Sequence, residues 1–129
     1  MYMVERIQVQ SRSPFEIYHI LNSLEKVPEI TVEAELFLPQ VDGPFGCVIA
    51  LHGSMGWAEH HQDHINIWLK AGLAVCKVNS FSSRSVDNTV DDQLTVTHAM
   101  MIVDAFRIRA VLEQDPRIGK IGVAGWSLG

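Results

Sequence analysis

Several features are scarce or absent in this sequence of 129 residues, and each absence excludes a class of protein. No apolar run approaches the roughly 18 residues that indicate a membrane-spanning helix. No cluster of lysine and arginine offers the basic surface that nucleic acid requires, and the net charge is −5. The segment Met1–Arg6 lacks the basic stretch and the apolar stretch of a signal peptide. We therefore expect a soluble, cytoplasmic protein with neither a nucleic-acid nor a membrane partner.

Cysteine is also scarce. The two cysteines, Cys47 and Cys76, both lie in apolar runs, where a free thiol behaves as a small hydrophobe, so we expect both to be buried and unpaired. What is abundant is apolar sequence: 47% of the residues are hydrophobic and only 19% are charged, which indicates a folded core. The length allows one domain.

The N-terminal segment predicts short elements. Val4–Val9 has the pattern of a short edge strand, and Ser13 followed by Pro14 is typical of a helix start. Ile30–Leu38 alternates apolar and polar residues, which predicts a half-buried strand. We expect residues 1–29 to form an N-terminal extension and residues 30–129 to form the core of the fold.

Further along the chain, the apolar residues run continuously instead of alternating. Three such runs, Cys47–Leu51, Leu73–Val78 and Ile121–Ala124, predict strands that a parallel sheet covers on both faces. We expect the last of these strands, Ile121–Ala124, to have a neighbour on each edge.

Helices are expected between these strands. One spans about Glu59–Lys70 and is stopped by Gly72, and the other carries apolar residues at helical spacing from Val90 to Leu112. Strands that alternate with helices through short links indicate right-handed crossovers. The sequence therefore predicts an α/β protein with a doubly wound, mostly parallel sheet.

The most informative motif closes the last predicted strand. Residues Gly125–Gly129 read G-x-S-x-G, the pattern of a nucleophile elbow, in which small residues flank a serine in a strained turn. Ser127 is the candidate nucleophile. The backbone N–H of Leu128, the next residue, would supply one half of an oxyanion hole.

A second loop is expected beside this motif. His52–Gly56 follows the first apolar strand, and ligand sites in such sheets lie beyond the carboxyl ends of the strands. A backbone N–H of this loop, that of Ser54 first and Met55 next, is the candidate for the second oxyanion donor. The alternative is an ordinary tight turn. His52 precedes the serine, whereas this fold places its catalytic histidine after it, so we interpret His52 as a residue that positions the loop.

The remaining ionisable residues provide no complete catalytic site. His60 and His64 lie one helical turn apart and could bind a metal, but a polar first turn of a helix explains them more simply, so we expect no metal or cofactor. No aspartate or histidine follows Ser127, where this fold places the acid and the general base. We therefore expect the 129-residue chain to be inactive or impaired by itself.

The stretch from about Ile30 to Gly129 resembles the dienelactone-hydrolase-like branch of the α/β-hydrolase superfamily. The residues that carry the resemblance are Leu51–Gly53, Asn79–Arg84, Asp92 and Gln93 before the long helix, Asp115–Gly119 and Gly125–Gly129. The resemblance implies an α/β-hydrolase fold truncated after the nucleophile-elbow strand. It also implies Ser127 as nucleophile, with Leu128 and Ser54 as oxyanion donors.

The resemblance further implies an ester- or lactone-cleaving enzyme that works through an acyl-serine and uses no cofactor. Arg84 lies near the place where the family holds a substrate carboxylate with an arginine; the alternative is a solvated loop arginine. Dienelactone hydrolases proper carry cysteine in the elbow and glutamate in the first loop, so Ser127 and His52 favour a general serine esterase. A peptidase or haloperoxidase variant is a weaker interpretation, and a non-catalytic fragment or binding module is the alternative from another class.

Overall fold

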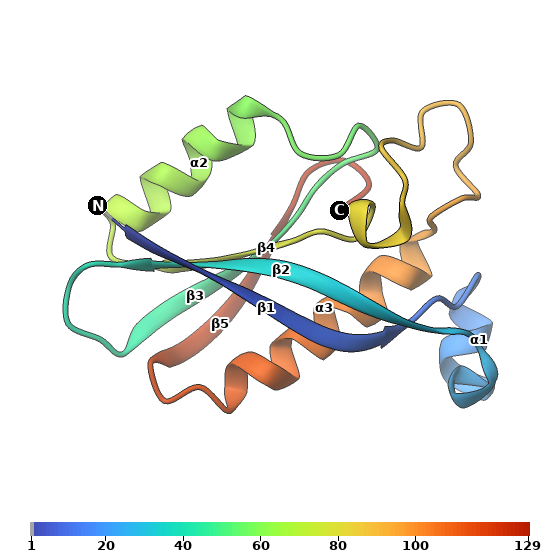
Figure 1. Cartoon of the computed structure of the whole chain (residues 1–129), viewed down its shortest axis with the longest axis horizontal. Helices are drawn as coiled ribbons and strands as arrows, with labels where there is room; N and C mark the ends of the chain where they lie inside the picture. Colours follow the sequence, from blue (N-terminus) through green and yellow to red (C-terminus); the bar gives the residue numbers. More distant parts are fainter. Residues whose placement is uncertain (1) are drawn as a thin grey trace.

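The computed structural model describes residues 2–129, which form a five-stranded mixed sheet with helices on both faces (Figure 1). The strand order across the sheet is β1-β2-β4-β3-β5. Strands β4, β3 and β5 are parallel to one another, whereas β2 is antiparallel to both of its neighbours. The strands are β1 (Tyr2–Arg12), β2 (Glu29–Pro39), β3 (Phe45–Leu51), β4 (Ala74–Val78) and β5 (Ile118–Gly125).

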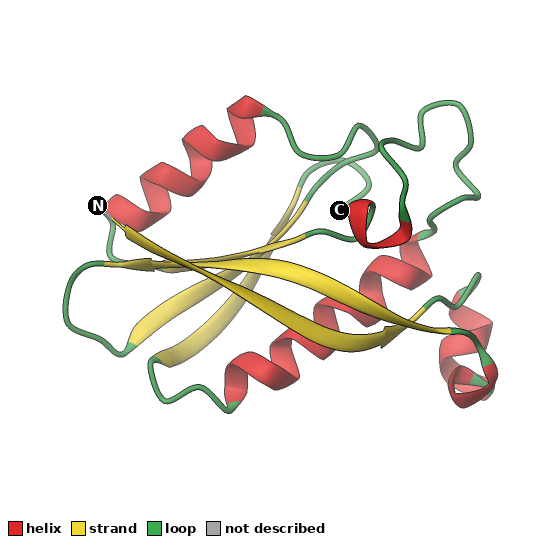
Figure 2. Ribbon diagram, viewed as in Figure 1, coloured by secondary structure: helices red, strands yellow, loops and turns green. Residues whose placement is uncertain are grey.

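Two helices cover opposite faces of this sheet, α2 (Glu59–Lys70) and α3 (His98–Glu113) (Figure 2). The alternation of β3 explains this arrangement, because neighbouring side chains point to opposite faces. Ile49 packs into the core that contains Ile108 of α3, and Ala50 packs into the core that contains Ile65 of α2. The predicted doubly wound α/β arrangement is confirmed.

Helix α2 has the bounds that the sequence predicts. Gly72 adopts a φ of +87°, and the Leu73 N–H donates to the Trp68 carbonyl at 3.0 Å, which is the hydrogen bond of a glycine-terminated helix end. No helix within residues 2–129 is long and apolar enough to cross a membrane.

Helix α3 begins later than the prediction, which placed its start near Val90. Val90 and Leu94 are 55% and 65% exposed and lie in a loop. Their N–H groups donate to the side chains of Asn88 and Asp92, at 3.2 and 3.0 Å, so local turns replace the helix there. The helix starts only after Thr97, whose Oγ1 accepts from the Met100 N–H.

The N-terminal strand is longer than the predicted Val4–Val9. Strand β1 pairs with β2 along its whole length, and Val9 is buried in the core beneath α3. The helix expected at Ser13 and Pro14 starts later, as α1 (Ile17–Asn22), and a single 3₁₀ turn (Leu24–Lys26) leads to β2.

Strand β5 pairs with β3 on one edge, and no strand among residues 2–129 covers its other edge. Val123 is 66% exposed, and an apolar groove between β5 and α3 is lined by Ala105, Phe106 and Ile121. Burial on both faces, predicted for Ile121–Ala124, is therefore not found within this part of the chain.

Both cysteines are buried free thiols, as predicted. Burial raises the pKa of Cys47 to about 12 and moves that of Cys76 in the same direction. Neither thiol is therefore a candidate nucleophile at neutral pH.

Candidate active site

The carboxyl ends of β3 and β5 lie side by side, so the segments that follow them leave the sheet together (Figure 1). Leu51, the last residue of β3, pairs with Gly125, the last residue of β5. The Trp126 N–H continues this contact and donates to the Leu51 carbonyl at 3.1 Å. The register thus brings the loop at residues 52–56 next to the turn at residues 126–129.

The turn at Ser127 has an unfavourable backbone conformation. Ser127 is exposed and has a φ of +54°, a left-handed conformation that is uncommon for a residue with a side chain. The Gly129 N–H donates to the Trp126 carbonyl at 3.0 Å and closes the turn.

The two flanking glycines are explained by close backbone contact. A Cβ atom added to Gly125 would collide with the backbone of Gly129, and one added to Gly129 would collide with the Leu51 carbonyl oxygen. A side chain at either position would therefore force the turn apart.

The loop that follows β3 packs directly against this turn. A Cβ atom on Gly53 would lie 2.9 Å from the Trp126 carbonyl oxygen and 3.4 Å from the Ser127 Cβ. Because Gly53 has no side chain, its backbone can approach the turn closely. The structure thus brings together the two loops in which the sequence places Ser54 and Ser127.

The loop is held so that its Ser54 N–H keeps a defined direction. The Gly53 carbonyl accepts hydrogen bonds from the Gly56 N–H at 3.0 Å and from Nδ1 of His52 at 2.9 Å. In the planar trans peptide between Gly53 and Ser54, the Ser54 N–H points away from that carbonyl. On the far side, the Ser54 carbonyl accepts from the Thr89 N–H at 2.8 Å.

Several backbone donors of the region are unused in the described part of the chain, among them the two that the sequence nominates first and the Met55 N–H. The N–H groups of Ser54 and Leu128 donate no hydrogen bond to any of residues 2–129. A buried or ligand-facing N–H needs an acceptor, so both are available to an oxygen atom of a ligand.

His52 is buried between the rings of Trp57 and Phe81, whose centroids lie 5.3 and 4.3 Å from its own. This burial lowers its pKa, so the ring is neutral at pH 7. Since a carbonyl can only accept, Nδ1 must carry the proton that bonds to Gly53. These contacts agree with a residue that positions the loop.

His61 fixes the start of α2 beside the turn. Its Nδ1 accepts from the Ala58 N–H at 2.9 Å, and its ring lies 4.6 Å from that of Trp126. The pKa of His61 is lowered, first by burial and then by the neighbouring His60, His52, His64 and Lys77. The Trp126 ring also lies 5.9 Å from the rings of both Trp57 and Trp68.

The histidine pair considered for metal binding lies in the first turns of α2. Nδ1 of His64 contacts the His60 carbonyl at 3.0 Å, as in an ordinary helical turn. Residues 2–129 contain no group of three or more histidine, cysteine, aspartate or glutamate side chains arranged to hold a metal ion.

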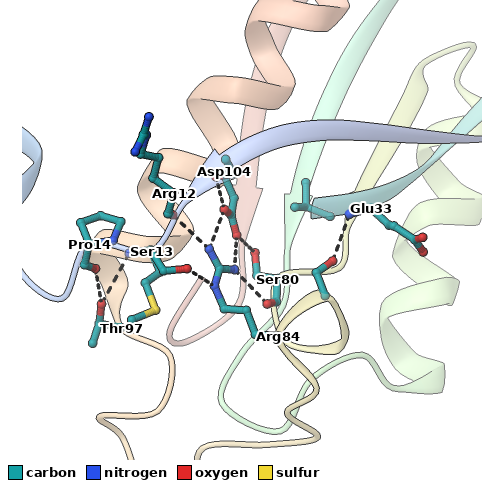
Figure 3. Close-up of polar contacts among 12 residues, drawn as sticks. Arg12, Ser13, Pro14, Glu33, Ser80, Arg84, Thr97 and Asp104 are labelled. Atoms are coloured by element: carbon teal, nitrogen blue, oxygen red, sulfur yellow. Dashed lines mark hydrogen bonds and ion pairs between the residues drawn. The ribbon is translucent and has the colours of Figure 1, made fainter. Parts of the chain in front are cut away.

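Arg84 lies in a 3₁₀ turn (Ser82–Arg84) and is neither solvated nor directed at a ligand (Figure 3). Its side chain is 6% exposed and pairs with Asp104, which is fully buried, through contacts of 2.7 and 3.0 Å. The remaining N–H groups donate to Ser13 Oγ and to the carbonyls of Ser80 and Arg12, at 3.0 to 3.2 Å.

These contacts use all five N–H donors of the guanidinium group of Arg84. The side chain therefore has no donor left for a substrate carboxylate. Arg84 is thus a structural residue here, and with a side chain only 6% exposed it is not a solvated loop arginine either.

The structure also gives Asp104 and Thr89 buried positions that the sequence did not predict. The Asp104 carboxylate accepts from Ser11 Oγ at 2.6 Å and from Ser80 Oγ at 2.7 Å, in addition to Arg84. An aspartate inside the apolar stripe of a long helix was the available signal, because such a residue is rarely buried without a partner. Thr89 Oγ1 is buried and has no hydrogen-bond partner among residues 2–129.

Solved structures with the dienelactone hydrolase fold resemble this chain over nearly its whole length. One described as a dienelactone hydrolase from Klebsiella pneumoniae matches with a TM-score of 0.62 and 16% identity, over 95% of this chain and 50% of its own. A dienelactone hydrolase-like promiscuous phosphotriesterase from metagenomic libraries matches with a TM-score of 0.59 and 13% identity, over 98% of this chain and 50% of its own. The structure named m3DLH matches with a TM-score of 0.55 and 11% identity, over 98% of this chain and 50% of its own.

No family model and no curated protein matches the chain. At these identities the structural likeness establishes the fold, so the predicted resemblance to dienelactone-hydrolase-like α/β proteins is confirmed at that level. The chain spans about half the length of the structures it matches. The match covers more than Ile30 to Gly129, because at least 95% of the chain is included.

We expect Asp104→Ala to destabilise the protein strongly. The change leaves the Arg84 guanidinium buried without its counter-charge, which typically costs about 3–5 kcal/mol. Glu113→Ala is the matched control, because it removes an exposed ion pair with Arg109 from the same helix, worth at most about 0.5 kcal/mol. Urea unfolding measures both free energies. Equal losses for the two variants would contradict the structural role of the buried pair.

We also expect stability to fall as the pH drops below about 6.5, the usual pKa of histidine. The folded-state pKa values of His52 and His61 are lowered, so the unfolded chain binds protons first and is favoured as the pH falls from 6.5 toward those values.

The double variant His52→Gln/His61→Gln should show a shallower pH dependence of the free energy of unfolding. Measurements should stay between about pH 5.5 and 8, because Glu5 and Asp115, whose pKa values are lowered by Arg117, lose their stabilisation under more acidic conditions. The same slope for wild type and variant would show that these histidines do not cause the effect.

Proposed function

We propose that this chain carries the nucleophile half of the active site of a serine hydrolase that cleaves an ester or lactone bond in a small molecule. The observation that supports it best is the exposed Ser127, held in a left-handed turn at the end of β5 against the Gly53 backbone. The shared fold adds support, because the neighbours' own names describe hydrolases.

The proposed reaction begins when Ser127 Oγ attacks the carbonyl carbon of the substrate and a general base takes the hydroxyl proton. The carbonyl oxygen becomes an oxyanion that accepts hydrogen bonds from the Leu128 and Ser54 N–H groups. When the bond to the leaving group breaks, the alkoxide receives the proton and an acyl-serine remains. Water then attacks the acyl carbon by the reverse proton transfers and releases the acid.

The general base and the acid that orients it are to be sought outside residues 2–129. Ser127 makes no hydrogen bond to a histidine within this part of the chain. His52 is not the base, because its ring is enclosed by Trp57 and Phe81 and makes no hydrogen bond to Ser127.

In this proposal His52 acts through the backbone. By donating to the Gly53 carbonyl it keeps the Ser54 N–H aimed away from that oxygen, in a direction set before substrate arrives. A donor that needs no reorientation during the reaction stabilises the oxyanion more effectively than one that must turn. The reaction requires no cofactor.

We expect a fluorophosphonate probe to label Ser127 in the longest reading frame that contains residues 1–129, and Ser127→Ala to abolish the label. Ser54→Ala should still be labelled, because its proposed contribution is a backbone N–H. Residues 1–129 alone should hydrolyse p-nitrophenyl acetate no faster than their own Ser127→Ala variant, because an unassisted hydroxyl is weakly nucleophilic. Equal labelling of wild type and Ser127→Ala would favour the non-catalytic alternative.

A second test, made in the same reading frame, asks whether the loop at residues 52–56 contributes an oxyanion donor. Gly53→Ala places a Cβ against the Trp126 carbonyl and should move the loop away from the turn, lowering kcat by about 10²–10³-fold, as loss of one donor does. Gly122→Ala is the matched control, since nothing lies within 4 Å of its added Cβ. Steady-state kinetics measure both, and unchanged kcat for a folded Gly53→Ala protein would remove the loop from the mechanism.

A further inference from the structure

A cavity of about 190 Å³ lies between the loops that follow β3 and β4. Trp57 and Phe81 contribute aromatic rings to its lining, and His52, whose ring packs between those two, also lines it. His52 directly precedes Gly53, the residue that packs against Ser127. The cavity is therefore a neighbour of the candidate active site, formed by other residues than the proposed nucleophile and oxyanion donors.

The size and the aromatic walls indicate what the cavity can hold. An apolar cavity of roughly 150 Å³ accommodates a benzene ring in another protein, so this one has room for a monocyclic group. Aromatic rings pack against one another in offset or edge-to-face arrangements, which the walls provided by Trp57 and Phe81 permit.

The polar groups of the cavity include unused hydrogen-bond acceptors. The side chains of Asn79, Ser82 and Asp87 line it and make no hydrogen bond with any of residues 2–129; the Asn79 amide and the Ser82 hydroxyl can each donate as well as accept, whereas the Asp87 carboxylate accepts. His52 carries its proton on Nδ1, so its Nε2 is an acceptor, and that atom likewise has no partner within this part of the chain. Trp57 adds no donor, because its Nε1–H already bonds to the Val78 carbonyl at 3.0 Å.

The charges of the region disfavour an anion. Asp87 is the only carboxylate among the lining residues, and none of them is a lysine or an arginine. The guanidinium of Arg84 is fully engaged by Asp104 and its neighbours, so it cannot balance a ligand carboxylate. The Lys77 ammonium lies 5.1 Å from the centre of the Trp57 ring, but Lys77 does not line the cavity.

We propose that this cavity binds an uncharged monocyclic aromatic group that carries an O–H or N–H donor, such as a phenol, and discriminates against carboxylates. The ring stacks against Trp57 and Phe81, and the donor bonds to His52 Nε2 or to Asp87. The proposal deepens the function proposed above and rests on it in one respect only, namely that the bound group is part of an ester substrate.

Binding can be measured without catalysis. Titrations of residues 1–129 with 4-fluorophenol and with 4-fluorobenzoate, followed by ¹⁹F NMR near neutral pH, compare a neutral phenol with an ionised carboxylate of similar size. We expect a Kd in the millimolar range for 4-fluorophenol and a Kd at least tenfold higher for 4-fluorobenzoate. Equal affinities would overturn the proposal.

Variants locate the site. Ser82→Phe should weaken 4-fluorophenol binding at least tenfold, because the added ring fills the cavity from an exposed position whose side chain makes no hydrogen bond. Asp87→Asn should improve 4-fluorobenzoate binding severalfold, whereas Asp91→Asn, which removes the same charge from a nearby exposed residue outside the cavity, should not. Unchanged phenol binding in Ser82→Phe, or equal effects of the two asparagine variants, would place the ligand elsewhere and refute the assignment.

The Ser127→Ala variant separates this proposal from the function. Because Ser127 does not line the cavity, the variant should bind 4-fluorophenol like the wild type. Binding that persists while the fluorophosphonate probe fails to label Ser127 would support the cavity and contradict the hydrolase. Labelling of Ser127 without binding of 4-fluorophenol would support the hydrolase and contradict the cavity assignment.

Discussion

The buried ion pair between Arg84 and Asp104 is the interaction on which the arrangement of the chain depends. It joins α3 to the 3₁₀ turn after β4, and the same arginine reaches the end of β1 through the Arg12 carbonyl and Ser13 Oγ. Removing two charges from water is unfavourable unless each donor and acceptor finds a partner. Here the hydroxyl groups of Ser11 and Ser80 donate the remaining hydrogen bonds to the Asp104 carboxylate. Three segments distant in sequence must therefore be in place together, and the loop that lines the cavity is held between them.

A second constraint, the close approach of backbones, forms the candidate site. Glycine at positions 53, 125 and 129 lets the loop after β3 meet the turn after β5 at distances that no side chain would permit. The parallel register of β3 and β5 brings the two segments to one edge, and His52 then fixes the orientation of one peptide plane. Sheet register, glycine spacing and the His52 hydrogen bond thus together fix the Gly53–Ser54 peptide next to the turn at Ser127.

Features governed by local sequence could be predicted, and features governed by long-range polar contacts could not. The continuous apolar runs and Gly72 located three strands and α2, because burial and helix termination leave a direct pattern. The start of α3 was misplaced because Val90 and Leu94 keep a helical spacing, yet Asn88 and Asp92 satisfy their N–H groups in turns. The burial of Arg84 was missed because its partners Asp104 and Arg12 lie 20 and 72 residues away in the chain.

The gathering of aromatic rings around the turn has an optical consequence. All three tryptophans of the chain meet there, since Trp57 and Trp68 each lie 5.9 Å from Trp126, the residue that directly precedes Ser127. The imidazole of His61 packs against the same group. The near-ultraviolet emission of the protein therefore comes mainly from one cluster that includes the residue next to Ser127, so that its spectrum records how Trp126 packs against α2 and Trp57.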